Sequence, residues 1–394
     1  MSLSIVLPLA SGRTETWKLR EAAAFAAPTS TPRFDRIAYS AAHVVSDPLA
    51  ARDPWLAAAI DWDATIAYRQ RLWSLGLGVA EAMDTAQRGM GLDWPTSLVL
   101  IRRSLDAARD MPGALVASGC GTDHLPPEQA KTVADVVHAY EMQMAAIEAL
   151  GGRLIVMASR ALARVAAGPA DYEHVYDRLL TQSKQPVILH WLGDMFDPAL
   201  AGYWGSSNVD RAMETALGVI AANPGKVDGI KISLLDKDKE IAMRRRLPEG
   251  VRMYTGDDFN YAELIAGDGT GSSQNHRHSD ALLGIFDAIA PAASAALAAL
   301  AGGDRARFDA ILAPTVPLSR KIFEAPTRFY KTGIVLMAYL NGHQSHFTMV
   351  GGHQSARGLV HLADVFRLAD QAGLLADPDR AAARMRLITA LHGL

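Results

Sequence analysis

From residue 36 onward, short apolar runs alternate with longer segments whose apolar residues recur at helical spacing. Apolar runs without strict alternation are typical of parallel strands that are covered on both faces. The strands that we expect cover residues 37–43, 79–83, 114–118, 153–157, 186–190, 226–233, 251–255 and, in a glycine-rich stretch, 267–273. Eight alternations of strand and helix favour a closed parallel barrel over an open sheet.

Several of the expected helices begin at recognisable start signals. Asp61 precedes the first helix, and Asp93-Trp94-Pro95 opens the second. Pro127 suits the first turn of the third helix, in which apolar residues keep helical spacing from Val133 to Ile147. Capping carboxylates and prolines in the first turn are common helix starts, so the strand–helix alternation rests on two independent signals.

Both ends of the chain depart from this alternation. Residues Ser4–Leu9 and Thr14–Leu19 suit two strands around a glycine-containing turn. After residue 280 the pattern is helical. The sequence therefore predicts an α/β fold: a (β/α)8 TIM barrel over residues 36–280, an N-terminal β-hairpin and connector in residues 1–35, and a C-terminal helical extension, residues 281–394, packed on the barrel.

Composition indicates the cell compartment and the kinds of partner to expect. With 394 residues and a net charge of −3, the chain gives no reason to expect a nucleic acid or a membrane as partner. A single cysteine, Cys120, excludes an intramolecular disulfide and fits a reducing cytoplasm. No signal peptide is recognisable, and the alanine-rich segment 288–300 is too short to span a bilayer. We expect a cytoplasmic enzyme with a small-molecule substrate, assembled as a dimer or tetramer.

Lys231 is the most informative residue of the expected strands. It lies in the apolar run 226–233, and a buried ammonium is costly unless it is paired, reaches solvent or becomes neutral. Active sites of (β/α)8 barrels lie at the C-terminal ends of the strands. A lysine there is where a Schiff-base enzyme places its nucleophile. The alternative is a strand-end lysine whose amine reaches solvent.

His190 ends the strand that precedes the one with Lys231. A lysine nucleophile needs a neighbouring group that moves protons, and histidine titrates in the appropriate range. The alternative is that His190 caps its strand and bonds a loop carbonyl.

Other polar segments follow the expected strands. The run from Gly267 to Ser273 could present backbone N–H groups to a carboxylate or phosphate, although such a run is also often only a tight turn. His276, His278 and Asp194 are candidate metal ligands, but their spacing matches no strong metal motif. A later glycine-rich loop with His353 either closes over the site or faces solvent.

These residues resemble the dihydrodipicolinate synthase and N-acetylneuraminate lyase superfamily of class I aldolase barrels, in a divergent bacterial branch. Gly229-Ile230-Lys231 resembles the family's strand with the Schiff-base lysine. Gly256-Asp257-Asp258 and Gly269-Thr270-Gly271-Ser272 resemble its two following segments. The tail pattern is carried by Gly302-Gly303-Asp304, Pro317-Leu318, Lys331 and Gly333. The resemblance implies a TIM barrel and lysine chemistry.

The chain also departs from the family. Where the synthases have a relay tyrosine in a Y-N-x-P context, this chain has His190, and Met195 stands near the position of their carboxylate-binding arginine. The G-T-T-G-E segment corresponds to Met83–Arg88, which keeps only Thr85. The resemblance therefore implies lysine chemistry on a substrate other than that of dihydrodipicolinate synthesis.

Our leading hypothesis is a class I (Schiff-base) lyase or aldolase that acts on a small hydroxylated keto compound, such as one derived from a sugar, without a cofactor. Lys231 forms the imine and His190 moves protons. The expected substrate ligands are Asp84, Thr85 and Asp257 for hydroxyl groups, and Gly271 and Ser272 for an anionic group. Two alternatives stay open: a metal-dependent barrel isomerase or hydrolase that uses His190, Asp194 and His276, and a non-catalytic sugar-binding barrel.

Overall fold

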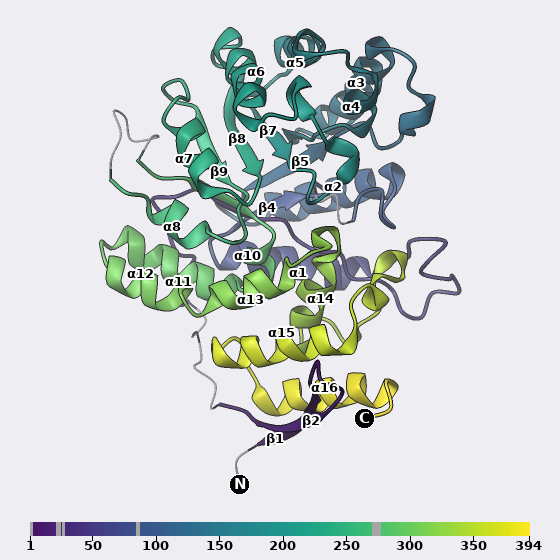
Figure 1. Cartoon of the computed structure of the whole chain (residues 1–394), viewed down its shortest axis with the longest axis vertical. Helices are drawn as coiled ribbons and strands as arrows, with labels where there is room; N and C mark the ends of the chain where they lie inside the picture. The colour runs from purple at the N-terminus through teal and green to yellow at the C-terminus, as the bar shows by residue number, and fades with distance from the viewer. Residues whose placement is uncertain (1–2, 21–24, 26–27, 84–86, 270–276) are drawn as a thin grey trace.

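A closed barrel of eight parallel strands forms the centre of the computed structural model, which describes residues 3–20, 25, 28–83, 87–269 and 277–394 (Figure 1). The strands are β3 (Ala38–Ser40), β4 (Gly78–Glu81), β5 (Val116–Cys120), β6 (Arg153–Val156), β7 (Val187–Leu192), β8 (Val227–Ser233), β9 (Arg252–Thr255) and β10 (Asp280–Leu283). They pair in chain order, and β10 closes the barrel by pairing with β3. The predicted TIM barrel is confirmed.

The eighth strand was placed wrongly by the sequence pattern. Its predicted position was 267–273, whereas the barrel closes with β10 at Asp280–Leu283, which lies across the domain boundary expected at residue 280. Gly267 and Gly269 have φ values of 71° and 69°, which belong to turns and not to strands. Residues 270–273 lie outside the described residues. Asp280 begins the true strand and accepts a hydrogen bond from the backbone N–H of Ile37 at 2.8 Å.

Most of the helices around the barrel begin directly after a residue that caps them. Asp61 and Asp93 cap α1 (Trp62–Ser74) and α2 (Trp94–Arg109), as predicted. Pro127 instead begins a separate short turn, and Thr132 caps the third helix through a capping box with Asp135. The remaining barrel helices are α3 (Val133–Ala149), α4 (Arg160–Val165), α5 (Pro169–Gln182), α6 (Val209–Ala222), α7 (Lys237–Arg244) and α8 (Tyr261–Ala266).

The interior of the barrel is a packed core and not a channel. Its buried apolar cluster includes Tyr39, Ile155, Ile188 and Tyr254, one side chain from each of four strands. Gly229 leaves room for the Tyr254 ring, since a Cβ at this position would lie 2.6 Å from a ring carbon. Because side chains fill the middle of the barrel, substrates can reach the strands only at their ends.

The C-terminal extension is helical, as expected, and it packs with the N-terminal hairpin. Its elements are α10 (Ile285–Ala288), α11 (Ala290–Ala301), α12 (Arg305–Leu312), α13 (Thr315–Ile322), η4 (Thr327–Phe329), α14 (Lys331–Leu340), η5 (Val350–Ser355), α15 (Leu359–Gln371) and α16 (Pro378–Leu391). Figure 1 shows the hairpin, β1 (Ser4–Pro8) and β2 (Thr14–Lys18), beside α15 and α16 and away from the barrel. None of the helices in the described ranges is long and apolar enough to cross a membrane.

A buried ionic cluster joins the extension to the barrel. Asp287 of α10 accepts hydrogen bonds from the backbone N–H of His43 at 2.7 Å and from its Nδ1 at 2.9 Å. Lys331 of α14 lies 3.4 Å from the same carboxylate. Burial alone would raise the pKa of Asp287, but its contacts with His43 and Lys331 hold it well below the usual value. Asp287 is therefore an ionised carboxylate inside the protein.

We expect Asp287→Asn to destabilise the protein by about 3–5 kcal/mol, because it removes the buried charge that contacts both Lys331 and His43. Urea unfolding measures the loss. The matched control is Asp309→Asn, since Asp309 forms an exposed pair with Arg305 at 2.8 Å and such pairs contribute at most about 1 kcal/mol. Equal losses in the two variants would contradict the role assigned to the buried cluster.

Candidate active site

Lys231 and His190 meet inside the C-terminal end of the barrel. Lys231 of β8 lies opposite His190 of β7 on one side and Tyr254 of β9 on the other. Paired residues of parallel strands point to the same face of a sheet, and Tyr254 belongs to the interior cluster. Both side chains are buried, with 7% of Lys231 and 2% of His190 exposed. The two residues expected to carry the chemistry are therefore neighbours.

The imidazole of His190 is held in its neutral form. Burial and the nearby charge of Lys231 lower its pKa well below the usual value. Neither ring nitrogen has a hydrogen-bond partner among the residues that the structure describes, so the strand-capping alternative finds no support there. A neutral imidazole offers one donor and one acceptor. Buried polar atoms without partners are uncommon, and a substrate group is one explanation for them.

Gly256 makes room for the lysine. A Cβ at this position would lie 2.7 Å from Cε of Lys231 and 2.2 Å from Oγ of Ser233. Gly256 directly follows β9. The need for space beside Lys231 and Ser233 explains why the Gly256-Asp257-Asp258 segment begins with glycine. Any larger residue at position 256 would displace the side chain of Lys231, whose exact position matters for the proposed chemistry.

Asp257 and Asp258 hold the loop after β9. The carboxylate of Asp257 accepts hydrogen bonds from the backbone N–H groups of Phe259 at 2.9 Å and Asn260 at 3.0 Å, and from Nδ2 of Asn260 at 2.8 Å. Asp258 accepts one from the backbone N–H of Ile285 at 2.8 Å. Both oxygens of Asp257 are engaged within its own turn, so these contacts support a structural role rather than the expected binding of substrate hydroxyls.

Several expected site residues cannot be placed. Asp84, Thr85, Gly271, Ser272 and His276 all lie outside the described residues. Of the possible metal ligands, Asp194 is exposed in the loop after β7, whereas His190 is buried. The described part of the chain contains no group of three or more His, Cys, Asp or Glu side chains that could hold a metal ion.

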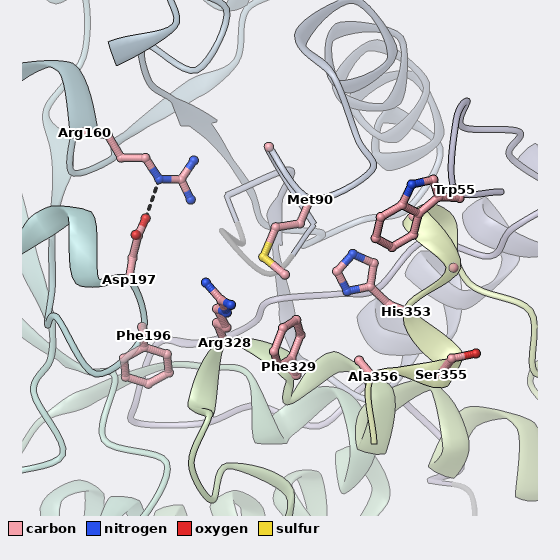
Figure 2. A pocket seen from close by; sticks show the side chains of 13 residues that line it. Trp55, Met90, Arg160, Phe196, Asp197, Arg328, Phe329, His353, Ser355 and Ala356 are labelled. Atoms are coloured by element: carbon pink, nitrogen blue, oxygen red, sulfur yellow. Dashed lines mark hydrogen bonds and ion pairs between the residues drawn. The ribbon is translucent and has the colours of Figure 1, made fainter. Parts of the chain in front are cut away.

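A cavity of about 550 Å³ lies between the loops at this end of the barrel and the C-terminal extension (Figure 2). Arg160, the first residue of α4, and Asp197, in the loop after β7, form an ion pair of 2.5 Å at its edge. The extension contributes Arg328, Phe329 and His353. His353 of the late glycine-rich loop thus lines this cavity, and closure of that loop over the site stays a prediction. Lys231 and His190 are not among the lining residues.

Most of this cavity was missed by sequence reasoning. Arg160 and Asp197 follow strands β6 and β7, so their position after predicted strands is a signal that could have found them. Arg328 and Phe329 come from a short turn far along the helical extension, and nothing in the local pattern indicates that this turn faces the barrel.

The closed barrel with a lysine on its sixth strand has the fold of the dihydrodipicolinate synthases, as the predicted resemblance implied. The enzyme of Thermotoga maritima superimposes with a TM-score of 0.63 at 13% identity, covering 87% of this chain and 100% of that one. The 4-hydroxy-tetrahydrodipicolinate synthase of Methylacidiphilum fumariolicum gives 0.62 at 13% identity, covering 88% and 99%. A monomeric dihydrodipicolinate synthase variant gives 0.63 at 12% identity, covering 86% and 97%. At these identities the likeness shows the fold.

The chain belongs to the family described as "Protein of unknown function (DUF993)", whose model matches residues 5–394. The match includes the hairpin, the barrel and the extension, so all three are part of one family pattern. The search of curated proteins finds no sequence match.

We expect Gly256→Ala to destabilise the protein by about 1–3 kcal/mol, since the added methyl group overlaps Lys231 and Ser233. Gly218→Ala is the matched control. Gly218 lies within α6, and a Cβ there meets no atom within 4 Å. Alanine should be neutral or stabilising by up to about 1 kcal/mol at such a position. Urea unfolding compares the two variants, and a harmless Gly256→Ala would show that the space beside Lys231 is not tight.

Glu240 gives a prediction for the dependence of stability on pH. It lies on α7, where its carboxylate accepts hydrogen bonds from Thr255 at 2.9 Å and Ser279 at 2.6 Å, and burial raises its pKa from 4.5 to about 8. Between these values the folded protein binds more protons than the unfolded chain, so this group makes stability fall as pH rises. The slope is about 1.4 kcal/mol per pH unit.

Glu240→Gln stays uncharged, so it should remove this slope. Urea unfolding at pH 5, 6.5 and 8 measures the effect. We expect the stability of the variant relative to the wild type to rise with pH across this window. Two parallel curves would mean that Glu240 titrates near its ordinary value.

Proposed function

We propose that this protein is a class I lyase or aldolase in which Lys231 forms a Schiff base with a small keto compound. The observation that carries the proposal is the pairing of Lys231 with a neutral, buried His190 at the C-terminal end of the barrel. The fold shared with the dihydrodipicolinate synthases supports it, although at low sequence identity. The space that Gly256 leaves beside Lys231 supports it as well.

The proposed reaction begins when Nζ of Lys231, in its neutral form, attacks the carbonyl carbon of the substrate. One proton moves from nitrogen to oxygen to give the carbinolamine. A second proton, delivered to the carbinolamine hydroxyl, lets it leave as water and gives the iminium ion. The iminium accepts the electron pair released when the neighbouring carbon–carbon bond breaks. Protonation of the resulting enamine and addition of water return the product and the free lysine.

His190 is the proposed proton carrier. It stands where the synthases have their relay tyrosine, and its neutral imidazole can accept a proton at one nitrogen and donate one from the other. Because the imidazole of His190 is buried, it exchanges protons only with groups that touch it. The oxygen of a carbinolamine on Lys231 is the proposed proton acceptor and donor.

The proposed substrate is hydroxylated and derived from a sugar, because Met195 stands near the position at which the synthases have their carboxylate-binding arginine. Asp84 and Thr85 remain the proposed ligands of substrate hydroxyl groups, with Gly271 and Ser272 for an anionic group. For Asp257, whose oxygens are engaged in a turn, we propose support of the loop in addition. Assembly into a homodimer or homotetramer is also a proposal.

Borohydride trapping tests the lysine. Reduction in the presence of a panel of keto acids and ketoses should give a stable adduct, and peptide mass spectrometry should locate it on Lys231. Lys231→Met keeps the length of the side chain and should abolish the adduct. The matched control is Lys226→Met, at the residue directly before the same strand, which should keep the adduct. Absence of an adduct with every compound of the panel would contradict the proposal.

His190→Gln tests the proposed proton transfer. The adduct should still form, while turnover of a trapped substrate should fall by about 10²–10⁴-fold, as expected for loss of a general acid–base group. Activity that survives Lys231→Met and is lost with EDTA would support the metal-dependent alternative instead. Binding without turnover that persists in Lys231→Met would support a sugar-binding barrel.

A further inference from the structure

Two arginines reach the cavity between the barrel and the extension (Figure 2). Arg160 uses its Nε to bind Asp197, and its Nη1 lies beside Gly89, where a Cβ would come within 2.9 Å. Arg328 is exposed and lies over the ring of Phe329 at 4.8 Å. Among the residues that the structure describes, no carboxylate pairs with Arg328. The cavity therefore has one guanidinium without a counter-charge and a second one that is only partly engaged.

Besides Asp197, Ser355 and His353, the rest of the lining is apolar, and three of its side chains are flat rings. It includes Trp55, Met90, Phe196 and Phe329, which Figure 2 shows around the same space as the two arginines. His353 lies beside them, with its ring centroid 6.1 Å from that of Phe329. Burial lowers the pKa of His353, so this ring adds a hydrogen-bonding group and no positive charge. Flat apolar walls beside guanidinium groups with N–H donors left over suit a ligand that has both an apolar part and an anionic part.

Close backbone contact holds the two walls together. A Cβ at Gly91 would lie 2.7 Å from the backbone nitrogen of Gly351, and a Cβ at Gly351 would lie 2.9 Å from the carbonyl oxygen of Met90. Both glycines have positive φ values, 112° and 66°. Thr332 of α14 donates a hydrogen bond to the carbonyl of His353 at 2.7 Å. The cavity is therefore formed before a ligand arrives, which reduces the cost of binding.

We propose that this cavity binds a small organic acid that carries a flat apolar group. Its carboxylate or phosphate lies between Arg160 and Arg328, and its apolar part lies against Phe329, Met90 and Trp55. Guanidinium groups bind such anions through paired N–H donors. The proposal does not depend on the Schiff-base reaction, because Lys231 and His190 do not line this space.

Isothermal titration calorimetry on the full chain tests the proposal with four probes. Benzoate and phenyl phosphate combine both features, benzyl alcohol lacks the charge, and inorganic phosphate lacks the apolar group. We expect the first two to bind at least about tenfold more tightly than the other two. Benzyl alcohol lacks the charge-assisted hydrogen bond and inorganic phosphate lacks the buried ring, and each of these contributes about that factor. The stronger of benzoate and phenyl phosphate identifies the anionic group.

Arg328→Met should weaken the better probe by about tenfold or more. Arg307→Met, an exposed arginine of α12 outside the cavity, is the matched control and should bind as the wild type does. Arg160→Met should also weaken binding, and its thermal unfolding shows whether loss of the pair with Asp197 has disturbed the fold. Lys231→Met should bind normally, which separates this test from that of the Schiff base.

Two results would overturn the proposal. One is that neither benzoate nor phenyl phosphate binds more tightly than about 10 mM. The other is that a probe binds equally well to the wild type, Arg160→Met and Arg328→Met, which would place it elsewhere on the protein.

Discussion

The carboxylate of Asp287 is the interaction on which the arrangement of this protein depends. It is buried between His43, which follows the first barrel strand, and Lys331, which begins α14. A buried charge is tolerated only when it is paired and hydrogen-bonded. The cluster therefore fixes α10 and α14 against the barrel in one position. The segments next to α14 carry Arg328 and His353, so the same contacts decide where the wall of the large cavity stands.

The barrel interior around Lys231 and the cavity at the mouth of the barrel differ in the exposure of their charged groups. Inside the barrel, Lys231 stands beside an imidazole that burial keeps neutral, and Gly256 gives the lysine its space. At the cavity, the arginines are accessible, and one of them lacks a carboxylate partner among the described residues. A low-dielectric pocket suits proton transfer and covalent chemistry, whereas an accessible pair of guanidinium groups suits recognition of an anion.

Apolar runs along the chain were enough to predict a closed barrel, because strands buried on both faces leave a strong signal. The last strand escaped, since it begins with the polar Asp280 and follows a glycine-rich segment that looked like a better candidate. The meeting of Lys231 and His190 could be foreseen from strand order alone. The roles of Trp55, Arg328 and His353 could not, because contacts between a loop and a distant extension have no local pattern. The hydrogen bonds of Asp257 within its turn could not be predicted from the sequence either.

The hairpin on α15 and α16 joins the two ends of the chain. Trp17 donates a hydrogen bond to Asp370, and Arg367 pairs with Glu15, so these contacts span 353 and 352 residues. A ribosome adds ~5–20 residues per second, which separates the partners by tens of seconds during synthesis. For that time the residues of the hairpin lack the surface on which they pack in the folded protein. The hairpin is thus made well before the helices that hold it in the folded protein.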